Sequence, residues 1–351
     1  MPGSPPATLH ELWYSQATNA EHAAVAPDGT IYFSTGRIEA VAPDGTPKWS
    51  FPTYLNPQID LTNDGCGAPA VGPDGTIYFG TDKHGIVAVT PQGSLKWTYA
   101  IAASVSQRPE VAHGTVFAGG DQRVYAVREN GTLAWSAPFP EGQAKRAFAV
   151  AADANGTVYA GGAGALVAFS PTGQVAWRAA SLPGMFGTPA WFSKPAITHG
   201  GNIAATAGQD GVYVFAPNGT QLNRYAIGAG NFGDGARSTA VVAPDNDAVY
   251  VIGTDGILYA FANGRVQWSV PVSSDALIAE DQLTIAPSGR IWLSTYGRLR
   301  AFDPTNGALA VSYVPPSRGG VTPAAIRLDI TALPNGRVLA GSYTGLAALV
   351  P

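Results

Sequence analysis

The sequence has few of the features that mark several common classes of protein. A single cysteine, Cys66, stands among 351 residues, which excludes an internal disulfide and a multi-cysteine metal site. Charged residues make up only 13% of the chain, and the net charge is -4. The sequence contains no run of charged residues of one sign. A nucleic-acid partner or a polybasic membrane contact is therefore not expected. No apolar stretch reaches membrane-spanning length, and residues 1–13 lack the basic and apolar segments of a signal peptide. We expect a soluble chain without membrane insertion, or a processed form of an exported one.

Turn-forming residues are abundant instead. The chain contains 43 glycines and 28 prolines, spread along its whole length. APDGTIYF at 26–33 returns as GPDGTIYF at 72–79, and APDGTPKW at 42–49 uses the same Pro-Asp-Gly. Proline sets φ at the first turn position, aspartate bonds its own backbone, and glycine accepts a positive φ. Each Pro-Asp-Gly therefore predicts a tight hairpin.

The turns recur at a fixed period. Intervals of 39 to 47 residues separate eight equivalent turn positions, which are Gly29, Gly75, Gly114, Gly156, Gly201, Asn246, Gly289 and Gly336. Each unit contains four short apolar or alternating segments divided by glycine turns, with no helical periodicity. Eight units of four antiparallel strands are typical of a β-propeller, whereas an open solenoid is the competing repeat architecture.

The two ends of the chain favour the propeller. After Gly336 the sequence stops before a fourth strand, and TLHELWYSQ near the amino terminus supplies one. The 15 residues after Gly336 and the 29 up to Gly29 make 44, one ordinary repeat length. We therefore predict an all-β, eight-bladed propeller formed by residues 1–351 as a single domain. Residues 8–15 would close the ring by pairing with residues 344–350, which hides the open edges.

The repeat resembles a known family. AVTPQGSLKW (88–97), AVRENGTLAW (126–135) and AFSPTGQVAW (168–177) look like the repeat of the PQQ-like (pyrroloquinoline-quinone-like) β-propellers. That family includes quinoprotein dehydrogenases and the scaffold lipoprotein of the outer-membrane barrel-assembly machine. The resemblance implies that a tryptophan near the end of each unit docks on the next blade, here Trp13, Trp49, Trp97, Trp135, Trp177 and Trp268. Arg224 and Val311 take that position in blades five and seven. The resemblance also implies a periplasmic or secreted location.

The quinone site of those dehydrogenases is not matched. In the family, the quinone stacks on a disulfide of adjacent cysteines and on a tryptophan, beside a calcium ion. A single cysteine cannot form that disulfide, so we expect neither the quinone nor another cofactor. No histidine has metal-ligand spacing, so no metal site is expected.

Charged residues collect where each innermost strand would begin. We call that rim the top face; it carries the connections between blades, and loops on one face of a rigid ring commonly hold sites. Blades three to six supply the basic residues Arg108, Lys145, Arg146, Lys194 and Arg237. The other blades supply the acidic residues Glu21, Asp64, Glu280, Asp281 and Asp329. Such a polarised funnel would concentrate an anionic ligand, or the two sets would neutralise each other through water across the channel.

A cysteine nucleophile is a second candidate on this face. Cys66 and His22 fall in neighbouring blades at similar depth, with Asp329 and other carboxylates able to orient an imidazole. The alternative is a small buried thiol at the start of a strand. Trp191 and nearby aromatic residues would either form a stacking wall for a ligand or pack as a cap over the funnel.

Two classes of function are consistent with these features. The first is a binding or scaffold module, monomeric, that takes a small anionic molecule or a protein partner at the top face. The second is a hydrolase or lyase that acts on a small anionic or ester-bearing substrate in the same funnel. Family resemblance specifies a fold more strongly than an activity, and no strong catalytic motif decides between the two classes.

Overall fold

The computed structural model describes most of the chain. The described residues are 7–17, 20–52, 66–105, 107–139, 149–162, 164–180, 191–207, 211–227, 239–253, 255–272, 283–295, 297–317, 329–342 and 344–350. Within these ranges the structure contains strands and turns, and no helix of the length and apolarity needed to cross a bilayer occurs there.

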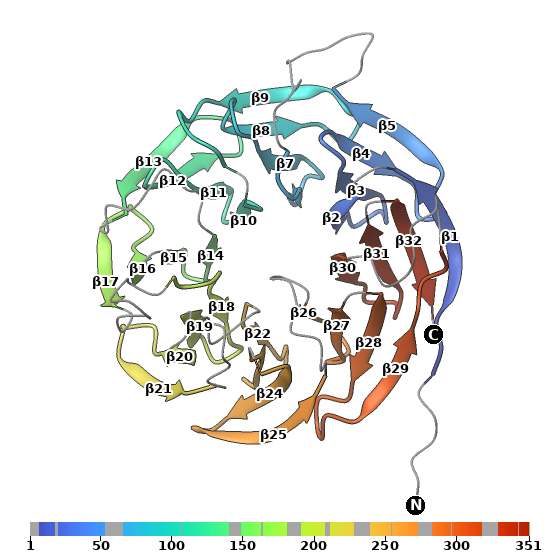
Figure 1. The fold of residues 1–351 in the computed structure, drawn as a ribbon. Coiled ribbons are helices and arrows are strands. Elements are labelled where there is room, and N and C mark those ends of the chain that lie inside the picture. The colour runs from blue at the N-terminus through green and yellow to red at the C-terminus, as the bar shows by residue number, and fades with distance from the viewer. Residues whose placement is uncertain are drawn as a thin grey trace, which may run out of the picture. The chain divides into compact units, whose positions relative to one another are not determined.

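The strands form eight antiparallel sheets of four, the blades of an eight-bladed β-propeller, as the repeats predict (Figure 1). The chain divides into two compact units, which are residues 19–181 and residues 1–18 with 182–351. We call them the first-half unit and the second-half unit. Each contains four blades.

The first-half unit consists of blades one to four. Their strands, in order within each sheet, are β2 (Glu21–Val25), β3 (Ile31–Ser34), β4 (Ile38–Val41) and β5 (Pro47–Phe51); β6 (Ala70–Val71), β7 (Ile77–Gly80), β8 (Ile86–Val89) and β9 (Leu95–Tyr99); β10 (Glu110–Ala112), β11 (Thr115–Gly120), β12 (Arg123–Arg128) and β13 (Leu133–Pro138); β14 (Val150–Ala152), β15 (Val158–Gly162), β16 (Ala165–Phe169) and β17 (Val175–Ala180).

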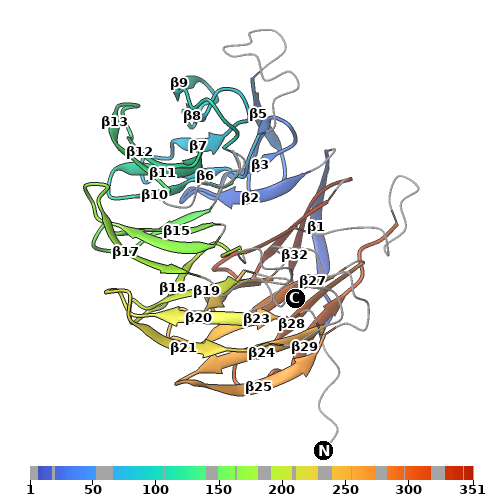
Figure 2. The same ribbon diagram turned by 60° about the vertical axis from the view of Figure 1, so that its left-hand side comes forward.

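The second-half unit consists of blades five to eight, whose sheets lie face to face (Figure 2). Their strands are β18 (Ala196–Ile197), β19 (Ile203–Ala207), β20 (Gly211–Phe215) and β21 (Gln221–Tyr225); β22 (Val241–Val242), β23 (Val249–Ile252), β24 (Ile257–Ala262) and β25 (Arg265–Pro271); β26 (Leu283–Ile285), β27 (Ile291–Thr295), β28 (Arg298–Phe302) and β29 (Leu309–Tyr313); β30 (Asp329–Ala332), β31 (Val338–Ser342), β32 (Gly345–Val350) and β1 (His10–Gln16).

The order of the strands determines the two faces of each unit. The first strands of successive blades lie next to one another. In the first-half unit their spatial order is β2, β6, β10, β14, and in the second-half unit it is β18, β22, β26, β30. Each first strand begins at the top face, where the turn between the second and third strands also lies. The opposite, bottom face carries the turns between the first and second strands and between the third and fourth strands.

The Pro-Asp-Gly turns have the predicted geometry. In the first of them, Gly29 has a φ of 84° and its N–H donates to the carbonyl of Ala26 at 2.9 Å. The Asp28 carboxylate accepts from the backbone N–H of Thr30 at 2.9 Å and from its hydroxyl at 2.9 Å. Both hydrogen bonds lower the pKa of Asp28, and the bond from the backbone N–H has the larger effect. The turn is therefore stabilised by its own residues, and this is why the motif is readable from a short stretch of sequence.

The second and third strands are largely buried because the sheets of each unit pack against one another. Every residue of β15 and of β16 is buried, which explains their continuous apolar sequences. The cores are formed by pairs of consecutive blades; between blades one and two, for example, the rings of Phe51 and Phe79 meet edge to face at 6.3 Å. Each blade thus depends on its neighbours for burial.

Tryptophan docking between blades takes the form that the resemblance implies. Four indole Nε1 groups each donate at 2.9 Å to a carbonyl in the third-to-fourth-strand turn of the next blade: Trp49 to Pro91, Trp97 to Glu129, Trp135 to Pro171 and Trp268 to Pro304. The indole lies on the glycine of that turn. A Cβ on Gly173 would be 2.6 Å from the Trp135 ring. Glycine is required there both for its positive φ of 83° and for this close approach.

Blade five lacks the tryptophan and packs in another way. The Arg224 guanidinium lies over the Tyr213 ring of its own blade, at 5.7 Å from the centroid. The seam to blade six is formed next to it, where Tyr225 stacks on Phe261 with 4.3 Å between the ring centroids. The Asp247 carboxylate, from the first turn of blade six, also accepts from the N–H of Gly200 in blade five at 2.7 Å. Stacked tyrosine and phenylalanine rings therefore replace the indole at this seam.

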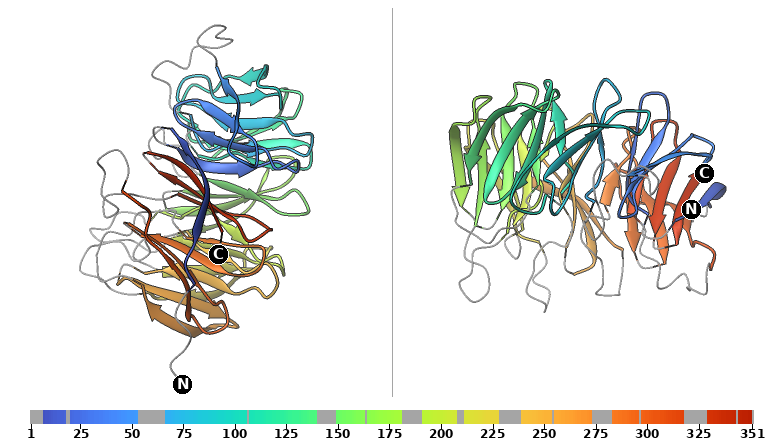
Figure 3. Two further views of the ribbon diagram at one scale, coloured as in Figure 1. Left: turned by 90° about the vertical axis from the view of Figure 1, so that its right-hand side faces the viewer. Right: turned by 90° about the horizontal axis from the view of Figure 1, so that it is seen from above.

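Blade seven has Val311 at the tryptophan position, and the amino-terminal segment covers it. Ala7 pairs with Val311 in a parallel bridge; its N–H donates to the carbonyl of Ala310 at 2.9 Å, and its carbonyl accepts from Ser312 at 3.0 Å. Leu9, only 5% exposed, packs in the core of blades seven and eight. The chain then continues as β1, which pairs antiparallel with β32 from His10 opposite Val350 to Gln16 opposite Gly345 (Figure 3). The predicted closure by the amino-terminal strand is confirmed.

Candidate functional site

Cys66 lies at the top-face entry to blade two. It forms a bridge with Thr81, and the N–H of Gly67 donates to Gly80 at 2.8 Å, so the segment extends the pairing of β6 with β7. The Ser34 hydroxyl of blade one donates to the Cys66 carbonyl at 2.8 Å. The Cys66 Sγ donates to the carbonyl of Gly36 at 3.5 Å. A carbonyl oxygen that accepts the thiol proton would repel a thiolate, and the thiolate is the nucleophilic form. This contact favours the protonated form of the half-buried Cys66 thiol.

We therefore predict slow alkylation of Cys66. Iodoacetamide at neutral pH should label the folded protein at least about tenfold more slowly than it labels free glutathione, since Sγ is half-buried and hydrogen-bonded. Mass spectrometry over a time course measures the rate, and labelling after denaturation provides the control. Labelling of the folded protein as fast as glutathione would support a nucleophilic role instead.

Arg108 lies before the first strand of blade three, as predicted. Its guanidinium donates to the carbonyl of Ala23 in blade one at 3.1 Å. Arg108 therefore links the inner strands of two blades that are not consecutive in the sequence. A charge-assisted bond of this kind both stabilises the unit and places a positive charge beside the inner strands.

Trp191 lies at the top-face entry to blade five. The next residue, Phe192, is fully buried, bridges to Ala207 and meets the Tyr213 ring edge to face at 5.5 Å. Ser193 donates its N–H to the carbonyl of Thr206 at 2.9 Å. These contacts hold the segment against blade five and leave Trp191 itself 38% exposed. Phe192 therefore packs in the core, whereas Trp191 faces solvent.

A family model matches almost the entire chain, in two overlapping segments. The model described as outer membrane protein assembly factor BamB, of the PQQ-like repeat, matches residues 34–190 and 164–350. The chain belongs to the BamB family. A search of curated protein sequences gave no match.

Solved structures agree with this fold. BamB from Moraxella catarrhalis is 19% identical, with 98% of this chain and 97% of that chain covered and a TM-score of 0.68. The carboxy-terminal WD40 domain of Sif2 is 12% identical over 99% of both chains, with a TM-score of 0.76. An inactive virginiamycin B lyase from Staphylococcus aureus, solved with quinupristin, is 10% identical over 98% and 99%, with a TM-score of 0.59. At these identities the similarity establishes the fold alone.

Several predicted site residues of this BamB-family chain lie outside the described residues. They are Asp64, Lys145, Arg146, Arg237, Glu280 and Asp281, together with the side chains of Glu21 and His22. The backbone of Glu21 pairs with Ser34 in β2 and β3. Asp329 is the first residue of β30, half-buried and paired with Gly341. Within the second-half unit, Trp191, Lys194 and Asp329 thus all lie at or just before first strands, as predicted.

Sequence reasoning missed a set of polar contacts at the top face of blades one and two. The Ser104 hydroxyl donates to the Asp82 carboxylate at 2.5 Å, and the Glu39 carboxylate accepts from Ser50 and, at 3.4 Å, from Thr35. No short motif marks them, because the partners come from different turns and strands. In the described part of the chain, no three histidine, cysteine, aspartate or glutamate side chains come together as metal ligands.

Proposed function

We propose that this BamB-family propeller is a binding or scaffold module that holds an anionic group of its partner at the top face. The observation that carries the proposal is the exposure of Trp191. All eight tryptophans lie in the described ranges, and among them only Trp191 is exposed; the other seven are buried or half-buried, most of them on outer strands. Exposed tryptophan on a rigid scaffold is a common anchor for a partner.

The chemistry of the segment favours an anionic partner. Lys194 lies three residues after Trp191 and two residues before the start of β18. An indole supplies a large apolar surface, and an ammonium group supplies a charge-assisted bond to a carboxylate or phosphate oxygen. Within the second-half unit, the predicted residues Arg237, Asp281 and Asp329 belong to the same proposal, the carboxylates taking a neutral or cationic part of the ligand. In the first-half unit, Arg108 places a positive charge beside the inner strands, and Lys145, Arg146, Glu21 and Asp64 belong to the proposal there.

A binding titration tests this proposal. The probes are citrate and a fluorescein-labelled acidic decapeptide, with a basic decapeptide as the charge-reversed control. We expect the acidic probes to bind, and Trp191→Ala and Lys194→Ala to weaken binding by about 5- to 150-fold, corresponding to one or two lost contacts. Melting temperatures should change little.

Arg265→Ala provides the matched control. Arg265 is exposed at the start of β25, next to a bottom-face turn of the same unit, so its removal should leave binding unchanged. Equal loss with Arg265→Ala would indicate a general charge effect, and unchanged binding in the Trp191 and Lys194 variants would contradict the proposal. Release of a cleaved product from the bound probe would instead favour hydrolase or lyase activity.

A further inference from the structure

The third-to-fourth-strand turn of blade three differs from most of its counterparts. Blades one, two, four, five and seven have a proline there: Pro43, Pro91, Pro171, Pro217 and Pro304. In blades one and two this proline packs on the first turn of its own blade, 2.9 Å from an ideal Cβ on Gly29 and 3.0 Å from one on Gly75. Blade three has Glu129 instead. Its N–H, which proline lacks, donates to the carbonyl of Gly114 at 3.1 Å.

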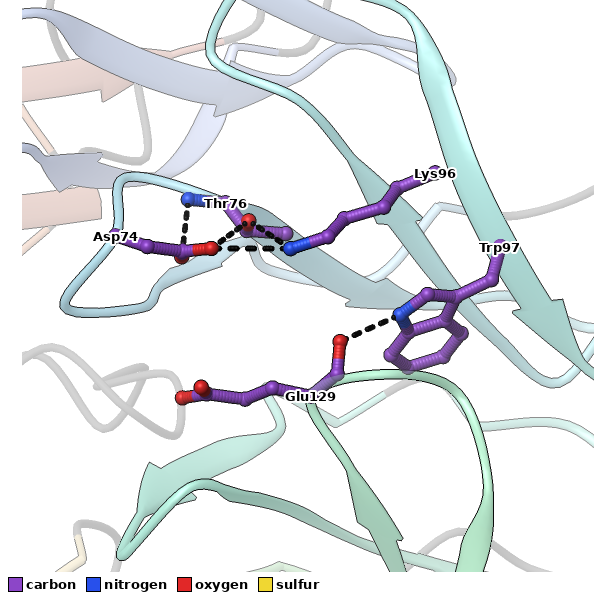
Figure 4. Close-up of polar contacts among 5 residues, drawn as sticks. All are labelled: Asp74, Thr76, Lys96, Trp97 and Glu129. Atoms are coloured by element: carbon purple, nitrogen blue, oxygen red, sulfur yellow. Dashed lines mark hydrogen bonds and ion pairs between the residues drawn. The ribbon is translucent and has the colours of Figure 1, made fainter.

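The side chain of Glu129 reaches the seam with blade two. Figure 4 shows it directed away from Trp97, below a polar group formed by Asp74, Thr76 and Lys96 in this view. The Glu129 Oε1 atom is fully buried and has no hydrogen-bond partner among the described residues. The hydroxyl of Tyr78, a residue of β7 that is 0% exposed, is also buried and has no hydrogen-bond partner among the described residues. Two buried polar atoms from adjoining blades therefore both require a partner.

Tyr78 and Glu129 both contact Trp97: the ring centroids of Tyr78 and Trp97 are 5.7 Å apart, and the Trp97 Nε1 group donates to the Glu129 carbonyl at 2.9 Å. Between blades six and seven, the equivalent tyrosine, Tyr250, donates to the carbonyl of Pro304, which has the place of Glu129, at 3.4 Å. Burial, together with the nearby carboxylates of Asp74 and Glu129, raises the pKa of Tyr78 to about 12. The hydroxyl thus keeps its proton at neutral pH and is available as a donor. The Tyr78 hydroxyl and the Glu129 carboxylate are not in direct hydrogen-bond contact, because neither has a partner at that range. Each group therefore needs a partner that the described side chains do not supply.

Lys96 decides which kind of molecule fits. Its Nζ is 3.0 Å from Asp74 Oδ2 and donates to the Thr76 hydroxyl at 2.9 Å. The ammonium group already supplies a positive charge to this seam, so a metal cation beside it would be repelled. Water both donates and accepts, and two to four polar partners are enough to hold a buried molecule.

We propose that the seam between blades two and three contains a buried water site, in which one water molecule accepts a hydrogen bond from the Tyr78 hydroxyl and donates one to Glu129 Oε1. The site replaces the proline contact of the other blades with a hydrogen-bonded link between blades. Leaving the two buried groups unpaired would be costly, since each lost its bonds to solvent on folding.

The contact between blades one and two provides a control for the contact between blades two and three. Between blades one and two, Asp28, Thr30 and Lys48 repeat the same polar group, with Lys48 Nζ donating to the Thr30 hydroxyl at 2.8 Å. Tyr32 takes the place of Tyr78 and is 1% exposed. Only the carboxylate is missing, because Pro91 stands where blade three has Glu129. A tyrosine variant at each seam can therefore be compared directly.

A double-mutant cycle and a crystal structure of the parent test the site. We expect Tyr78→Phe to lower Tm by about 2 °C or more in the parent. In a Glu129→Leu background, which lacks the acceptor, the same change should have little further effect, whereas Glu129→Gln, which keeps an acceptor oxygen, should preserve the effect. Tyr32→Phe should change Tm equally in all three backgrounds. In the parent structure, one density peak should lie about 3 Å from both Tyr78 Oη and Glu129 Oε1.

Additive effects of Tyr78→Phe and Glu129→Leu would overturn the proposal. A crystal structure in which the hydroxyl bonds directly to the carboxylate, or in which no density lies between them, would overturn it as well. Because the structure of the parent is sufficient for this second test, the proposal remains testable even if a variant fails to fold.

Discussion

Deletion of residues 1–16 is expected to lower Tm by roughly 10 °C, or to leave the protein insoluble. The deletion removes β1, which provides the outer strand of blade eight, and exposes the edge of β32. It also removes the Ala7 bridge to blade seven and the buried Leu9. Lost ladder bonds and lost apolar burial together amount to several kcal/mol. An unprotected edge strand also promotes association between chains. Differential scanning calorimetry and light scattering measure the two effects.

Two point substitutions test whether buried side chains of the amino-terminal segment contribute to stability through their packing. Leu9→Ala should cost about 2 to 4 kcal/mol, since Leu9 is 5% exposed and packs in the core of blades seven and eight. Leu12→Ala, in the same segment but 48% exposed, should change Tm little. If the deletion left Tm unchanged, or if both substitutions had equal effects, the amino-terminal segment would not have the structural role described.

Replacement of Trp97 by alanine should have the second largest effect, about 3 kcal/mol, or roughly 5 °C in Tm. The variant loses the Nε1 bond to Glu129 at 2.9 Å and the packing of the ring on Gly131 and against Tyr78, whose ring centroid is 5.7 Å away. Because Trp97 joins blades two and three, the loss should weaken a whole seam. Urea denaturation gives the free energy of unfolding directly.

Trp191→Ala is the matched control for this prediction. It removes the same side chain from an exposed position, so the free energy of unfolding should change by less than about 0.5 kcal/mol. Gly131→Ala offers an independent check from the opposite side of the contact. Gly131 has a φ of 85°, and a Cβ there would lie 2.8 Å from the Trp97 ring, so alanine should also destabilise the protein. A Trp97 variant as stable as the parent would show that indole docking contributes little to this seam.

The sequence alone was sufficient for the number of blades, their four strands and the turns between them. A hairpin turn is determined by three or four consecutive residues, and the Asp28 and Gly29 contacts are entirely local. Closure by the amino-terminal strand followed from counting residues, since one repeat length was divided between the two ends. The docking role of the tryptophans followed from the resemblance to the PQQ-like repeat, and equivalent residues in a repeat have equivalent neighbours.

Only the tertiary structure decided what happens where the repeat is broken. Val311 and Arg224 were visible as departures, yet neither the Ala7–Leu9 segment over blade seven nor the Tyr225–Phe261 stack could be deduced from them. Arg108 was correctly placed before a first strand, while its bond to Ala23, 85 residues away in sequence, was not foreseen. Nothing in the sequence marked the side chain of Glu129 as buried at a contact between blades. In each case the partner lies on another blade, and contacts between side chains distant in sequence depend on distances that a repeat period does not contain.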